Sequence, residues 1–154
     1  MINYYLATSE EDYKIAKGLF AEYAMSLKID LDFQKFDQEL LILEKMYGPP
    51  FGGIILAKEA EEILGCVAVR KINDTIGELK RMYVKPAHQN KGLGKILLNK
   101  AIHLAKACNY SKLRLDTLQE MIAAINLYKR TGFYEIAPYY FNPIPTVIFF
   151  EKQI

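Results

Sequence analysis

The sequence predicts an α+β domain in which antiparallel hairpins come first and a strand–helix–strand crossover follows. Three stretches of strand-forming residues, at 53–58, 63–72 and 76–85, are separated only by short polar turns, so hairpins are the economical connection. Residues 92–109 then keep the apolar spacing of a helix, and a further strand follows them. That order of elements is typical of a crossover between neighbouring strands.

The first third of the chain is expected to supply one strand and two helices. Residues 2–7 read as a strand, and the capping box Ser9-Glu10-Glu11-Asp12 begins a helix that runs to about Leu27. An irregular stretch is expected at 29–34. An amphipathic helix follows at 35–47, and the helix-breaking residues Gly48-Pro49-Pro50 end it. The last third adds a strand at 112–117, a helix at 121–131 that Gly132 stops, and two strands at 133–136 and 146–152 around a loop rich in Pro and Tyr. The sum is a mostly antiparallel central sheet of about seven strands, flanked by about four helices, in one domain spanning 1–154.

Composition narrows the class of protein. Twenty basic and eighteen acidic residues give a net charge of +2, which does not by itself suggest a nucleic-acid partner. No apolar run reaches the length of a membrane span, and residues 1–13 lack the pattern of a signal peptide, so the cytoplasm is the expected location. Cys66 and Cys108 match no metal spacing and are expected to be reduced. His88 and His103 match no ligand cluster either, so we expect surface positions for both and no metal.

The turn Gln89-Asn90-Lys91-Gly92-Leu93-Gly94 predicts an anion site. Glycines weaken a helix start, but without Cβ atoms they let a ligand lie against the backbone amides, which have no partner within the helix. Lys91 and Lys95 add positive charge to the positive end of the helix dipole, an unfavourable arrangement unless an anion such as a phosphate or pyrophosphate lies among them. A solvated, Lys-rich helix with glycines for tight packing is the alternative, and the physics alone leaves both open.

Two motifs resemble those of a known family. Gln89-x-x-Gly92-x-Gly94, after a strand that ends in Val-Lys-Pro, resembles the acetyl-CoA-binding signature of the GNAT superfamily of N-acetyltransferases. The block from Ala124 to Phe133 resembles the A-x-x-L-Y-x-x-x-G-F motif of the same family, at the expected distance downstream. The resemblance covers roughly residues 54–137. It implies a GNAT-like fold, with a sheet splayed in the middle, and acetyl-CoA (coenzyme A) as the co-substrate.

The resemblance also implies which residues hold the coenzyme. Alternation in the strand 76–85 breaks between Leu79 and Met82, which indicates either burial on both faces or a bulge between Lys80 and Met82. In GNAT proteins this strand is bulged, and its freed backbone groups hold the pantetheine. Met121 stands where many members carry an asparagine, so that contact cannot be carried over. The candidate coenzyme A contacts are Met82, Tyr83, Val84, Gln89, Asn90, Lys91, Gly92, Leu93, Gly94, Lys95 and Asn126, the last on a different side of its helix from the missing asparagine.

Catalytic roles are assigned by the same resemblance. Tyr128 matches the tyrosine that lies near the coenzyme A sulfur and is often assigned as general acid; packing between helix and sheet is the alternative. Glu78, eleven residues before Gln89, matches a catalytic glutamate of the histone-modifying branch and is the candidate general base. A solvated strand carboxylate, or a water chain in place of a single base, remains possible for Glu78.

The loop 138–145 is the candidate acceptor wall. Three prolines fix its shape, and three consecutive aromatic residues would form an exposed patch unless they cover something. We expect Tyr139, Tyr140 and Asn142 to line the acceptor pocket, with aromatic faces suited to an ammonium group; a lid on the core or a dimer contact is the alternative. The first two helices are expected to influence specificity.

The function predicted from these motifs is direct acetyl transfer from acetyl-CoA to a primary amine of a small molecule. The partner is thus a small-molecule amine, with no nucleic acid, no membrane and a possible homodimer. Two alternatives stay open: acetylation of a protein N-terminus or lysine, and an acyl-CoA-binding sensor without turnover.

Overall fold

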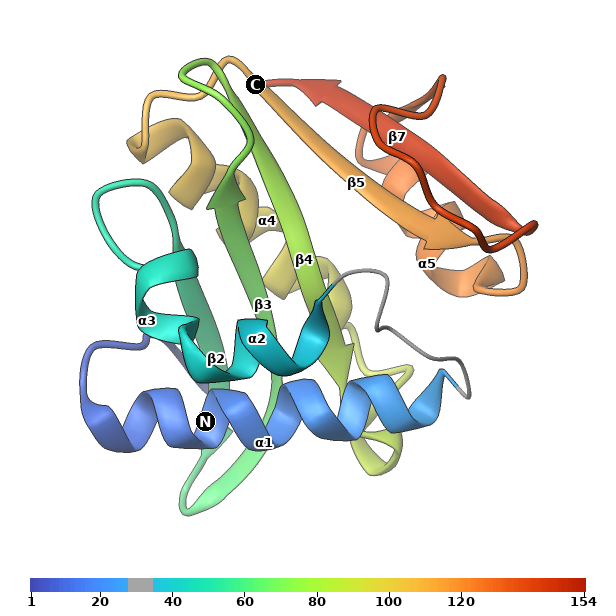
Figure 1. The fold of residues 1–154 in the computed structure, drawn as a ribbon. Helices are drawn as coiled ribbons and strands as arrows, with labels where there is room; N and C mark the ends of the chain where they lie inside the picture. The colour runs from blue at the N-terminus through green and yellow to red at the C-terminus, as the bar shows by residue number, and fades with distance from the viewer. Residues whose placement is uncertain (28–34) are drawn as a thin grey trace.

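The computed structural model describes residues 1–27 and 35–154 and contains one seven-stranded sheet with the order β1-β2-β3-β4-β5-β7-β6 (Figure 1). All neighbouring strands are antiparallel except β4 and β5, which are parallel. The strands are β1 (Asn3–Leu6), β2 (Gly53–Glu59), β3 (Glu62–Lys71), β4 (Ile76–Val84), β5 (Lys112–Leu118), β6 (Tyr134–Ile136) and β7 (Val147–Gln153). Each overlaps its predicted strand, so the α+β fold with a mostly antiparallel sheet is confirmed. The irregular stretch expected at 29–34 lies outside the described residues.

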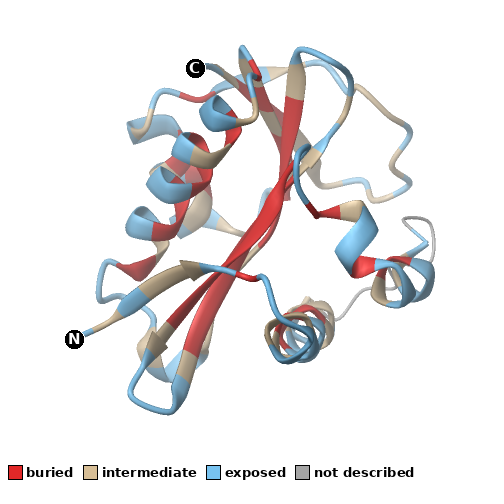
Figure 2. Cartoon of the chain, turned by 90° about the vertical axis from the view of Figure 1, so that its left-hand side faces the viewer, coloured by how far each residue is buried: buried red, intermediate tan, exposed pale blue. Residues whose placement is uncertain are grey.

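Helices cover both faces of this sheet. On one face lie α1 (Glu10–Ser26), α2 (Phe36–Leu41) and α3 (Leu43–Met46), and on the other α4 (Leu93–Ala107) and α5 (Ile122–Arg130), with a 3₁₀ turn, η2 (Pro86–His88), before α4 (Figure 1). Figure 2 shows the buried strands between the two helical layers. Each face has its own core: Leu97, Leu98 and Ala101 belong to the α4 side, and Leu19, Phe20 and Tyr47 to the α1 side. No helix in the described part of the chain is both long and apolar enough to span a bilayer.

The predicted single helix at 35–47 is wrong, because the structure divides it into α2 and α3. The β-branched Ile42 leaves the helical conformation with φ −123° and ψ 29°, which interrupts the ladder of backbone hydrogen bonds. Helices of six and four residues are not stable alone, so packing must hold them. Buried contacts supply it: Glu39 bonds to Arg81, and Leu43 lies in the α1-side core.

The sheet is splayed between β4 and β5. The two strands pair only from Ile76 to Glu78, against Lys112 to Arg114, and diverge beyond that point. In β4, Tyr83 pairs with Cys66 but Lys80 pairs with Ala68, so two residues of β4 oppose the single Val67 of β3. The predicted bulge between Lys80 and Met82 is therefore confirmed. Its first residue, Arg81, has φ +56°. The strand is also buried on both faces from 77 to 81, the other explanation that the sequence left open.

Candidate active site

A groove of about 550 Å³ runs between the end of β4, the turn after it, and α5. Of the residues expected to contact coenzyme A, eight line this groove: Met82, Val84, Gln89, Asn90, Gly92, Leu93, Gly94 and Lys95. Tyr83, Lys91 and Asn126 are not among the described residues that line it. Tyr83 lies on the opposite face of β4, where its ring packs 5.7 Å from that of Tyr23.

The turn before α4 is held in a shape that exposes backbone amides. Gln89 Nε2 donates to the backbone oxygen of Val84 at 2.9 Å, and Asn90 and Gly92 take left-handed conformations with φ +64° and +87°. Gly92 is the N-cap of α4, where no side chain caps the helix and no acidic residue lies in the first turn. The first amides of this 15-residue helix therefore lack the usual partners, and a phosphate fits that donor set. A Cβ at Gly94 would lie 3.6 Å from Leu127, so the glycine leaves room within the groove.

Eight of the residues that line the groove were not predicted from the sequence as coenzyme contacts, among them Arg130 and Met121. Arg130 lies at the end of α5 and, like Lys95, lines the groove. Its position six residues after Ala124, in the second motif, was the available signal. Met121 lines this groove and also two smaller cavities in the splay, so the residue that replaces the family's asparagine stands where the three spaces meet.

The two smaller cavities, of about 50 and 30 Å³, lie where β4 and β5 diverge. We call them together the splay chamber; five residues line both: Tyr23, Arg81, Asp116, Thr117 and Met121. The groove adjoins the chamber at Met82, Met121 and Ala124, which line both spaces. A long ligand in the groove could therefore place its end inside the sheet.

Tyr128 lies on the wall of this chamber. It projects from α5, is 5% exposed, and packs its ring 5.8 Å from Phe133 and 6.3 Å from Phe150. Burial raises the pKa of its hydroxyl well above the ordinary value. The hydroxyl therefore stays protonated at neutral pH, as a proton donor requires. Both interpretations of Tyr128, packing and proton donation, are compatible with this position.

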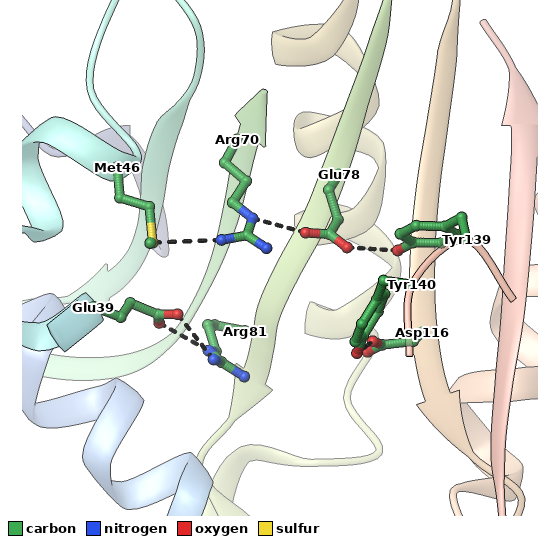
Figure 3. Close-up of polar contacts among 8 residues, drawn as sticks. All are labelled: Glu39, Met46, Arg70, Glu78, Arg81, Asp116, Tyr139 and Tyr140. Atoms are coloured by element: carbon green, nitrogen blue, oxygen red, sulfur yellow. Dashed lines mark hydrogen bonds and ion pairs between the residues drawn. The ribbon is translucent and has the colours of Figure 1, made fainter. Parts of the chain in front are cut away.

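Glu78 is buried within a polar network (Figure 3). It accepts hydrogen bonds from Arg70 Nε at 2.7 Å and from the Tyr139 hydroxyl at 2.5 Å. Burial alone would raise the pKa of Glu78, but the charges of Lys80 and Arg70 and the two hydrogen bonds outweigh it and hold the pKa below its ordinary value. Among the described residues, the carboxylate that lines the splay chamber is that of Asp116, whereas Glu78 does not line it.

The loop between β6 and β7 is attached to the sheet through its two tyrosines (Figure 3). Tyr139 donates to Glu78, and Tyr140 donates to Asp116. Asn142 donates from Nδ2 to the Tyr140 hydroxyl at 3.0 Å and accepts from the Ile144 amide at 2.9 Å. Of the three predicted acceptor residues, Asn142 lines the chamber, Tyr140 bonds to its lining residue Asp116, and Tyr139 bonds to Glu78, which does not line it.

Glu39 and Arg81 form a buried ion pair at the bulge (Figure 3). Arg81 donates from Nε and Nη2 to the two carboxylate oxygens, each at 2.9 Å, and both side chains are at most 4% exposed. The guanidinium also lies 5.2 Å from the ring of Phe36. Helix α2 thus fixes the strained residue of the bulge that opens the sheet.

Comparison with known proteins gives a consistent result. Residues 16–133 match the model of the Acetyltransferase (GNAT) family. An uncharacterized N-acetyltransferase of Schizosaccharomyces pombe is 37% identical over 146 residues, which cover 94% of this chain and 90% of the relative. A GNAT family acetyltransferase from Staphylococcus aureus superposes with a TM-score of 0.80 at 26% identity over 99% of both chains. Another, from Elizabethkingia anophelis with acetyl-CoA bound, gives a TM-score of 0.66 at 21% identity over 99% of this chain and 98% of that one. The chain belongs to the GNAT family of acetyltransferases.

Proposed function

We propose that this protein transfers an acetyl group from acetyl-CoA directly to the primary amine of a small molecule. The observation that carries the proposal is that the groove and the splay chamber share three lining residues, Met82, Met121 and Ala124. A pyrophosphate at the amides of α4, beside Lys95 and Arg130, would leave the pantetheine arm pointing along β4 toward Tyr128. The relative solved with acetyl-CoA bound shares this fold, which supports the choice of co-substrate.

Three of the predicted residues have roles at the splay chamber in this scheme. The Tyr128 hydroxyl would protonate the departing thiolate, and Tyr140 and Asn142 would wall the acceptor side. Glu78 is the general base that the sequence predicts, and replacement by glutamine tests that prediction. The small size of the chamber and the anchored loop beside it favour a small amine over a folded protein.

The test of activity is thiol release from acetyl-CoA in the presence of defined amines. Ethanolamine, putrescine, glycine and lysine represent small acceptors, and a short peptide with a free N-terminus and a lysine represents protein acceptors. Release with a small amine supports the proposal. Release with the peptide alone would move the function to protein acetylation, and coenzyme binding with no acceptor at all would indicate a sensor.

Binding of the coenzyme is tested separately with Gly94→Val. The valine side chain would enter the groove against Leu127 and block access to the first amides of α4, so calorimetry should show at least about a tenfold loss of coenzyme A affinity, or roughly 1.4 kcal/mol. Gly18→Val is the matched control, because Gly18 is an exposed helical glycine of α1 with no atoms near its missing Cβ. Equal affinities in the two folded variants would contradict this location.

A further inference from the structure

Asp116 is the carboxylate that faces both parts of the splay chamber. One of its two cavities is shared with Tyr128 and the other with Asn142. Asp116 therefore lies between the proposed proton donor and the acceptor wall. No motif pointed to this residue, since the second motif begins only at Ala124.

The register of the sheet explains why Asp116 reaches the chamber. Glu78 pairs with Arg114 across the parallel ladder, so their side chains share a face of the sheet. Two residues further along, Lys80 and Asp116 lie on that same face, but there β4 and β5 have already diverged. Arg114 is paired with Glu151 at 2.8 Å, whereas Asp116 lies opposite the apolar Phe149 of β7. Its carboxylate thus meets the open splay, and β7 provides no cation opposite it.

Tyr140 and Asn142 orient this carboxylate. The Tyr140 hydroxyl donates to Oδ2 of Asp116, and Asn142 donates in turn to the same hydroxyl. The Tyr140 ring packs edge-on against Phe149 at 5.4 Å, which fixes its position. An ionised carboxylate has about four acceptor sites, so the donation from Tyr140 leaves capacity for a further donor.

The charges around the chamber also favour a cation at Asp116. Arg81 is neutralised by Glu39 through two hydrogen bonds. Lys80 is the other buried cation among the described residues, and both Glu78 and Asp116 interact with it electrostatically. Burial lowers the pKa of Lys80, although Glu78 and Asp116 act against it, Glu78 more strongly. An ammonium group entering the chamber would be a charge-assisted partner for Asp116.

We propose that Asp116, oriented by Tyr140, binds the ammonium group of the acceptor and is the first acceptor of its proton. This assignment rests on the proposed function. The acceptor R–NH₃⁺ gives one proton to the Asp116 carboxylate, and the freed nitrogen lone pair attacks the thioester carbon. The C–N bond forms and the C–S bond breaks, with its electron pair going to sulfur. Sulfur takes a proton from the Tyr128 hydroxyl, which recovers one from the nitrogen, and Asp116 releases its proton to water.

The test compares Asp116→Asn with Glu78→Gln on two kinds of acceptor. Ethanolamine and putrescine are cationic at neutral pH, whereas hydroxylamine is mostly uncharged and needs neither an anionic partner nor deprotonation before it attacks. For the cationic amines, Asp116→Asn should lower kcat/KM by about 10- to 100-fold, the range expected for a hydrogen bond to a charged group. For hydroxylamine, corrected for the reaction without enzyme, the loss should stay below about threefold. Coenzyme A affinity by calorimetry should not change.

Three results would overturn the assignment. If Asp116→Asn has the wild-type kcat/KM for the cationic amines while Glu78→Gln has a lower one, Glu78 and not Asp116 binds and deprotonates the amine. If Lys80→Met restores activity to Asp116→Asn, Asp116 serves only to neutralise Lys80. If the wild-type enzyme releases no thiol with any amine or with hydroxylamine, the proposed function itself fails and this assignment fails with it; activity in the wild type separates that case from the first two.

Discussion

The Tyr128 side chain has two properties that a proton donor to a thiolate needs. It lies on the chamber into which the groove leads, and its raised pKa keeps the proton on the oxygen until a stronger base forms beside it. Its ring contacts with Phe133 and Phe150 hold it in one orientation. The packing that supports a structural interpretation of Tyr128 would equally position it for catalysis, so only removal of the hydroxyl distinguishes the two.

Tyr128→Phe removes that hydroxyl and keeps the ring contacts. Loss of a general acid should lower kcat by roughly 10²–10⁴ and leave the KM for acetyl-CoA within about threefold. Steady-state kinetics with the best amine of the panel measures both. Tyr110→Phe is the control, because its hydroxyl donates to the backbone oxygen of Phe51, outside the cavities of the site. A kcat for Tyr128→Phe within threefold of the wild-type value would show that Tyr128 only packs between helix and sheet and is not the general acid.

At the scale of elements, the geometry of the active site depends on helix α2 as much as on strand β4, which contains the bulge. The bulge of β4 requires a non-glycine residue, Arg81, at φ +56°, a conformation that costs free energy unless its surroundings fix it. Glu39 of α2 fixes it through a bidentate ion pair. A helix of six residues is therefore coupled to the opening of the sheet.

Glu39→Gln leaves the buried guanidinium of Arg81 without its countercharge. Breaking one partner of a buried ion pair typically costs about 3–5 kcal/mol, so the free energy of unfolding should fall by that order. Urea denaturation followed by circular dichroism measures the change. Glu44→Gln, an exposed glutamate of the adjacent α3, should change the stability by less than about 0.5 kcal/mol. A loss for Glu39→Gln as small as the control's would mean that α2 does not hold the bulge.

For the whole molecule, the helices and strands and the turn proposed to bind the coenzyme could largely be predicted from the sequence, but the acceptor side of the site could not. Periodicity and turn residues determine local structure, and the glycines of the turn have a local physical reason, so both could be predicted. The break at Ile42 could not, because the contacts that hold α2 and α3 are tertiary. Asp116 was missed, and Met121 was named only as the replacement of an asparagine. The importance of both arises where β4 and β5 stop pairing, which depends on the register of two strands far apart in the sequence.

The same register aligns charges from the two halves of the sheet in a row that should make the fold sensitive to acid. Arg70, Glu78, Arg114 and Glu151 lie opposite one another on consecutive neighbouring strands, with ion pairs of 2.7 Å and 2.8 Å at the two ends of the row. Burial acts to raise the pKa of both glutamates, but the cations and the hydrogen bonds from Tyr139 and Tyr134 outweigh it and lower both.

A carboxyl whose pKa is lower in the folded chain stabilises the fold above its unfolded value of 4.5, and that contribution disappears as the pH falls through the lower, folded value. Urea denaturation should therefore show a free energy of unfolding that decreases steadily below about pH 4.5. In Glu151→Gln the stability at pH 7 should fall by roughly 1–3 kcal/mol, because Arg114 loses its charged partner, and the decrease on acidification should become shallower. Glu135→Gln, at an exposed position of the neighbouring β6, should keep both the stability and the slope. An unchanged acid slope in Glu151→Gln would show that Glu151 does not contribute to the acid sensitivity of the fold.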